Sequence, residues 1–145
     1  MKGTSRTFLI VLAMATILAT VTTGAAVAGK GGRGHNPSAG SGGTISMVLL
    51  NSTDGVPHYG QQVTFNVSTT ATDKPSVKLN CYQGGVLVYT HSAGFYAGYP
   101  WPWEQTFTLR SGAWTGGAAD CTAELYFWDG RKFITLTTLG FHVYE

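Results

Sequence analysis

From Thr44 to the end of the chain, apolar and polar residues alternate with a period of two, and this alternation is the strongest constraint on the fold. A period of two is typical of β-strands that bury one face. Gly and Pro separate the alternating runs, and none has the spacing of a helix. Seven strands are predicted, over residues 44–50, 63–68, 77–82, 86–90, 105–110, 121–128 and 133–144. This number of short strands in about 100 residues predicts an all-β, two-sheet antiparallel sandwich.

Two connections have the composition of tight hairpin turns, Gln83–Val86 and Trp128–Arg131. The last predicted strand changes its alternation midway, so that its apolar residues fall on both faces. A β-bulge near Thr137-Thr138 or Gly140 would return them to one face, and we expect a bulge there.

The first 28 residues have the layout of a secretory signal peptide. Lys2 and Arg6 precede an uncharged apolar stretch, and Ala26-Val27-Ala28 supplies a cleavage pattern of small residues. The alternative is an uncleaved membrane anchor, because residues 7–28 carry no charge and are long enough to span a bilayer. The threonines in this stretch and the cleavage pattern favour cleavage. We therefore expect a secreted or cell-wall-associated protein without a membrane span after cleavage.

Residues 29–43 contain seven glycines and show no periodicity, which predicts a flexible Gly-rich linker before a folded domain over residues 44–145. Four of the nine basic residues precede Thr44, so the predicted domain holds five basic and seven acidic residues. This balance provides no basic surface for nucleic acid. We find no phosphate-binding motif and expect no cofactor.

Cys81 and Cys121 share the inward parity of their predicted strands, and in an exported chain such a pair favours a disulfide. Closing a loop of about 40 residues would stabilise the fold by about 4 kcal/mol in the chain-entropy model. Two isolated cysteines without a nearby histidine do not indicate a metal site.

The strand pattern, the cysteine pair and the run Ala118–Tyr126 resemble an immunoglobulin-like domain, such as those of secreted bacterial proteins of unassigned role. The chain departs from antibody domains, which join their second and sixth strands, because Cys81 lies on the third predicted strand. Ala119 stands two residues before Cys121, where antibody domains have a tyrosine. The bridge is therefore expected to join neighbouring strands of one sheet, unless the strand count is wrong by one.

The segment His91–Trp103 is rich in aromatic residues, glycine and proline, and we expect a long loop there. Two interpretations remain: the rings form a contact surface, or they fold back and close one end of the sandwich. In an extended Pro-rich backbone, the last two rings would face one way. The candidate binding residues are Phe95, Tyr96, Tyr99, Trp101 and Trp103.

Trp114 and Tyr59 would extend either the contact surface or the cap. The rest of the domain surface is expected to be polar and rich in threonine. The four histidines (His35, His58, His91 and His142) lack ligand spacing, so no metal site is predicted.

We expect a secreted, non-enzymatic β-sandwich that binds or coats a protein or polysaccharide at the cell surface. The sequence has no nucleophile elbow and no recognisable carboxylate pair. One alternative is a secreted inhibitor or effector. A less favoured alternative is a small hydrolase, which would require carboxylates such as Asp54, Asp73, Glu104 and Asp120 to converge in a pocket.

Overall fold

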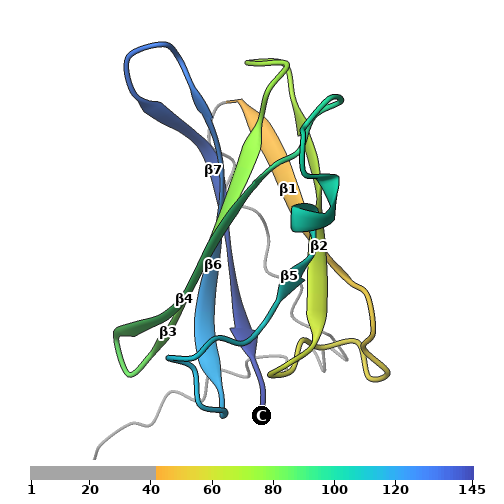
Figure 1. The fold of residues 1–145 in the computed structure, drawn as a ribbon, viewed down its shortest axis with the longest axis vertical. Helices are drawn as coiled ribbons and strands as arrows, with labels where there is room; N and C mark the ends of the chain where they lie inside the picture. Colours follow the sequence, from red (N-terminus) through yellow and green to blue (C-terminus); the bar gives the residue numbers. More distant parts are fainter. Residues whose placement is uncertain (1–41) are drawn as a thin grey trace, which may run out of the picture. The chain divides into compact units, whose positions relative to one another are not determined.

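The computed structural model describes residues 42–145, which form two antiparallel β-sheets (Figure 1). One sheet has the strand order β1-β2-β5, with β1 (Gly43–Leu49), β2 (Gln62–Thr69) and β5 (Phe107–Thr108). The other has the order β4-β3-β6-β7, with β3 (Ser76–Gln83), β4 (Val86–Gly94), β6 (Ala119–Trp128) and β7 (Phe133–Val143). A 3₁₀ helix, η1 (Pro102–Gln105), precedes β5. The predicted all-β sandwich is confirmed, whereas the predicted signal peptide and most of the linker lie outside the described residues.

The strand order is immunoglobulin-like, with β4 placed beside β3. In antibody constant domains the fourth strand instead borders the sheet of the first, second and fifth strands. The predicted tight turn after β3 explains the difference. Gly84 and Gly85 both have positive φ, 55° and 84°, which a two-residue hairpin turn of this kind requires. The short turn leaves β4 no partner but β3, and the two strands pair antiparallel.

The predicted bulge lies in β7. Thr137 pairs with Leu125 while Thr135 pairs with Tyr126, so Leu136 is an extra residue between them. Both Leu136 and Thr137 are buried, and the inward parity changes at this point. The bulge thereby turns the apolar residues of both halves of β7 toward the core.

The fifth predicted strand, over residues 105–110, is wrong in its extent. Only Phe107 and Thr108 form β5, because Gln105 closes the 3₁₀ helix. Beyond β5, Leu109 N donates to the main-chain oxygen of Gln61 at 2.8 Å, and Gly60 N donates to that of Leu109 at 2.9 Å. The segment therefore stays against the loop before β2 without continuing as a regular strand.

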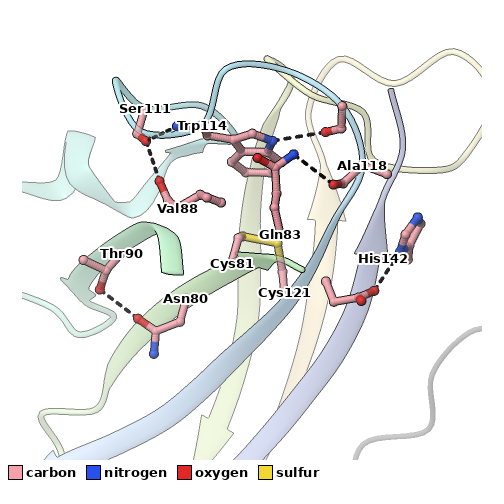
Figure 2. The surroundings of a disulfide bond; sticks show 12 residues. Asn80, Cys81, Gln83, Val88, Thr90, Ser111, Trp114, Ala118, Cys121 and His142 are labelled. Carbon is pink, nitrogen blue, oxygen red and sulfur yellow. Dashed lines mark hydrogen bonds and ion pairs between the residues drawn. A yellow bond between two sulfur atoms is a disulfide. The ribbon is translucent and has the colours of Figure 1, made fainter. Parts of the chain in front are cut away.

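The disulfide joins Cys81 of β3 to Cys121 of β6 (Figure 2). These residues lie directly opposite each other in the pairing of the two strands, with Cα atoms 4.0 Å apart. The expectation of a bridge between neighbouring strands of one sheet is confirmed. Both cysteines are buried in the core.

Trp114 closes the end of the sandwich near the disulfide. Its side chain has 0% exposure, and its indole nitrogen donates to the main-chain oxygen of Gly117 at 3.1 Å. The Tyr59 hydroxyl donates to the Trp114 main-chain oxygen at 2.9 Å. The side-chain amide of Gln83 donates to the main-chain oxygens of Gly116 and Ala118, which fixes the same loop (Figure 2). Trp114 and Tyr59 therefore close this end of the sandwich, and they extend neither the contact surface nor the cap predicted for the aromatic segment.

Candidate functional site

The opposite end of the sandwich carries the aromatic residues that the sequence singles out. Figure 1 shows the connection from β4 to η1 at the same end as the β2–β3 connection and the β6–β7 hairpin. β4 extends as far as Gly94, so the loop begins later than predicted, and His91 belongs to the strand. The aromatic loop is therefore defined here as Phe95–Trp103.

Phe95 points toward the core. It packs partly buried against the core, with its ring stacked on Phe107 at 6.3 Å between centroids and edge-on to Phe65 at 6.4 Å. Its main-chain nitrogen donates to the oxygen of Pro75 at 2.8 Å. Phe95 thus anchors the start of the loop and contributes little surface for a partner.

Tyr96 and Tyr99 are half-buried over the end of β4. Their rings meet edge to face, 5.5 Å between centroids, and both lie against Gly94. The Tyr99 hydroxyl donates to the Glu104 carboxylate at 3.0 Å. Burial, and then this hydrogen bond, raise the pKa of Tyr99 above its ordinary value. The two rings are therefore held in place by contacts on several sides.

Trp101 and Trp103 face solvent, with exposed fractions of 50% and 68%. The predicted extended backbone is wrong here, because Pro102 begins η1 and Glu104 N donates to Trp101 O at 3.0 Å. The fixed φ of proline suits the first turn of a helix as well as an extended segment, so Pro102 by itself does not distinguish these two backbone conformations. Trp101 remains edge-on to Tyr99, at 6.1 Å.

The sequence analysis missed a second aromatic cluster, formed by Tyr126 and Trp128 of β6 and Phe133 of β7. Trp128 and Phe133 are 54% and 67% exposed, and their rings lie 4.9 Å apart. Tyr126 meets Phe133 edge to face at 5.4 Å. The expectation that the remaining surface is polar is therefore wrong. The signal was present, because Tyr126 and Trp128 share the outward parity of β6 and Phe133 lies across the hairpin.

A hollow of about 480 Å³ lies between the aromatic loop and this second cluster. Tyr96 lines it from the loop, and Tyr126, Trp128 and Phe133 line it from the hairpin, together with Lys74, Ser76 and Gly130. Predicted and missed residues thus belong to one surface. We call it the aromatic strip: Trp101, Tyr99, Tyr96, Tyr126, Phe133 and Trp128.

Two histidine–aspartate pairs lie near the end of the chain. His58 contacts Asp54 at 2.8 Å, and His142 contacts Asp120 at 2.7 Å. Each histidine ring also packs near Tyr144, at 5.9 Å and 4.8 Å between centroids. The carboxylate of Asp54 also accepts from Ser52, so serine and histidine bind the same carboxylate and not each other. A catalytic serine needs a hydrogen bond to the histidine that activates it, and this arrangement joins each of them to the aspartate instead.

Three of the four acidic side chains named for a hydrolase make separate contacts. Asp54 and Asp120 hold separate histidines, and Glu104 accepts from Tyr99. Within residues 42–145, no group of three His, Cys, Asp or Glu side chains has a geometry that could hold a metal ion. The same part of the chain contains no helix that is long and apolar enough to cross a membrane.

Fold and surface together define a disulfide-bonded β-sandwich with an aromatic strip at one end. No protein-family model, curated protein or solved structure matches the chain.

Proposed function

We propose that the chain is a secreted, non-enzymatic module that binds a polysaccharide at the cell surface through its aromatic loop. The observation that carries this proposal is the exposure of Trp101 and Trp103, half or more of each side chain, on an ordered loop. Aromatic side chains offer a large contact area at a low entropic cost, and binding hot spots are enriched in tryptophan.

The loop is braced before any ligand arrives. The side-chain amide of Gln105 donates to the main-chain oxygen of Gly94 at 2.7 Å, and its own main-chain oxygen accepts from the Thr64 hydroxyl at 2.7 Å. Because both exposed tryptophans lie between these fixed points, little chain entropy is lost when they contact a partner. Flat rings beside polar groups such as Glu104 suit a sugar, which has an apolar ring face and a hydroxyl rim.

Export is part of the same proposal. The disulfide supports it, because disulfides persist in oxidising compartments outside the cytoplasm. Intact-mass analysis of the secreted protein should give a chain that starts at Gly29. Retention of Met1 in a membrane fraction would contradict both cleavage and secretion.

The binding test uses Trp101→Ala and Trp103→Ala, singly and together. Tyr82→Ala is the control, because Tyr82 lies on β3 at the opposite, disulfide end of the four-stranded sheet. We expect retention of the unmodified protein on purified bacterial cell wall, chitin or cellulose, and a loss of affinity of about 30-fold in the variants, typical of a hot spot. Denaturant unfolding should change by less than about 0.5 kcal/mol, because the replaced rings are exposed.

Several outcomes would contradict the proposal. One is the absence of retention on all three materials, and another is an equal loss in the Tyr82→Ala control. A loss of several kcal/mol of stability in the tryptophan variants would assign them a structural role instead. Retention that disappears when the cell wall is first treated with protease would indicate a protein target, as expected for an inhibitor or effector.

A further inference from the structure

The hollow beside Tyr96 is open to solvent and has room for a small ligand. Its volume of about 480 Å³ falls within the range of about 300–1,000 Å³ that is usual for small-molecule pockets. Four aromatic rings line it, and the side chains of Lys74 and Ser76 supply polar groups. A wall of rings with a few polar groups fits a ligand that is apolar on one face and polar at its edge.

The backbone on both sides of the hollow is held by the fold. On the loop side, Tyr96 rests on Gly94, where a Cβ atom would lie 2.6 Å from the ring. On the hairpin side, Trp128 and Phe133 are directly paired across β6 and β7. The turn that joins these strands is held by the Asp129 carboxylate, which accepts from the main-chain nitrogens of Arg131 and Lys132, both at 2.8 Å. The backbone that carries the lining rings is therefore in place before a ligand binds.

Lys74 is the only charged residue that lines the hollow. It forms no ion pair with any carboxylate of residues 42–145, where the ion pairs are the two histidine–aspartate contacts. In the neighbouring turn, Arg131 and Lys132 add two positive charges, and the Asp129 carboxylate adds one negative charge. Asp73 is the acidic neighbour in the chain, and its side chain does not line the hollow. The lining thus favours an anionic group on the ligand.

We propose that the hollow binds an acidic sugar unit of a polysaccharide, with the sugar ring against Phe133, Trp128 and Tyr96 and its carboxylate at the Lys74 ammonium. This inference rests on the proposed function and names the substrate class, because Trp101 of the aromatic strip, and Trp103 two residues further along the chain, would contact neighbouring units of the same polymer. An apolar peptide would leave the Lys74 charge without a partner.

The test is affinity electrophoresis of the secreted protein in gels that contain polygalacturonate, alginate or hyaluronate, each compared with its methyl-esterified form. Esterification removes the charge and keeps the sugar rings. Lys74→Gln and Phe133→Ala test the site, and Arg110→Gln removes one positive charge from an exposed residue outside it. We expect at least one acidic polymer to retard the unmodified protein, with an affinity about tenfold higher than that for its ester, the factor that 1.4 kcal/mol represents.

In Lys74→Gln, the acidic polymer should bind only as well as the ester, and Arg110→Gln should behave as the unmodified protein. In Phe133→Ala, binding to both forms should weaken. No retardation by any acidic polymer, equal binding of acid and ester, or an equal effect of Arg110→Gln would overturn the inference. If the protein is still retained on cell wall through Trp101 and Trp103 in those cases, the proposed function stands and only the acidic-sugar site fails.

Discussion

Gly94 controls how closely two tyrosine rings approach the end of β4. An added Cβ atom there would lie 2.4 Å from a ring carbon of Tyr99 and 2.6 Å from one of Tyr96. Real Cβ atoms do not make such contacts, and these rings cannot move freely because each also packs against the other. The absence of a side chain at residue 94 therefore places Tyr96 at the hollow.

We expect Gly94→Ala to destabilise the domain by about 1–3 kcal/mol, the usual cost of overpacking, and to weaken ligand binding by displacing Tyr96. Gly140→Ala is a matched control, because it is also a strand glycine and its added Cβ atom would meet nothing within 4 Å. Denaturant unfolding of both variants measures the difference. Equal stability of the two variants would show that the rings move aside at little cost.

His58 makes two hydrogen bonds that its neutral form cannot make together. Its Nε2 atom lies 2.8 Å from the Asp54 carboxylate, and its Nδ1 atom lies 2.6 Å from the main-chain oxygen of Glu145. Both partners are acceptors, so both ring nitrogens must carry a proton. The Asp54 contact and the Glu145 contact raise the pKa of His58 above 6.5, and the His58 and Ser52 contacts lower the pKa of Asp54 to about 2.

These shifts predict a dependence of stability on pH. The raised pKa of His58 stabilises the fold fully below pH 6.5, and this contribution is lost as the pH rises through the folded-state value. The lowered pKa of Asp54 stabilises the fold above pH 3.8, and this contribution is lost as the pH falls toward 2. The pair should therefore contribute most between about pH 4 and 6.5, and less at high salt.

The measurement is the free energy of unfolding from pH 4 to 9 for the unmodified protein and for His58→Gln. The difference between the two should shrink as the pH rises above 6.5, because glutamine does not titrate. Curves that run parallel over the whole range would show that His58 contributes no titrating interaction. When both proteins also carry Asp54→Asn, the difference between them should be smaller, because this substitution removes the carboxylate and keeps the shape of the side chain.

At the scale of the elements, the sequence predicts whatever depends on alternation and turn composition. The seven strands, the turn at Gly84-Gly85 and the bulge in β7 follow from local patterns, because burial of one face imposes a period of two. The β5 region was predicted too long and η1 was not predicted. A single turn of 3₁₀ helix has no periodicity, and Pro102 is compatible with either backbone.

The loop half of the candidate site stands out directly in the sequence, whereas its hairpin half has to be inferred from strand parity and pairing. Trp101 and Trp103 stand out because the aromatic loop is dense in rings over a few residues. Phe133 and Tyr126 are separated along the chain, and they meet because the hairpin turn pairs Trp128 with Phe133 and Tyr126 with Thr135. The sequence contains the parity of each residue, whereas the register of this hairpin depends on the type and length of the turn that follows Trp128.

The disulfide connects the two central strands of the four-stranded sheet. We expect Cys81→Ala/Cys121→Ala to lose about 4 kcal/mol of stability, because the bridge closes a loop of sequence separation 40 in the unfolded chain. Thermal unfolding with and without reductant checks the same value in the unmodified protein. An unchanged midpoint under reductant, with thiols already free in the untreated sample, would refute the bridge.

For residues 42–145 as a whole, the two ends of the sandwich have separate roles. The disulfide end holds the Trp114 cap and the His58 contacts to the last residues, and the opposite end holds the aromatic strip. β1 begins at the same end of the sandwich as the aromatic strip, because its first residue, Gly43, pairs with Thr69, the last residue of β2. Distant sites of this kind usually have additive energies, so changes in stability at one end should leave binding at the other intact.

The position of the disulfide also determines how the domain would respond to mechanical load. The bridge ties Cys81 to Cys121, so the chain between them cannot be extended while the bridge is intact. This span includes Trp101 and Trp103. An extended residue covers about 3.5 Å, so the 40-residue span between the cysteines corresponds to about 140 Å of contour length. A force that pulls on β1 and β7 would not extend this length while the bridge is intact. Stretching would therefore unravel the flanking strands first, and only a thiol would release the segment that carries the exposed tryptophans.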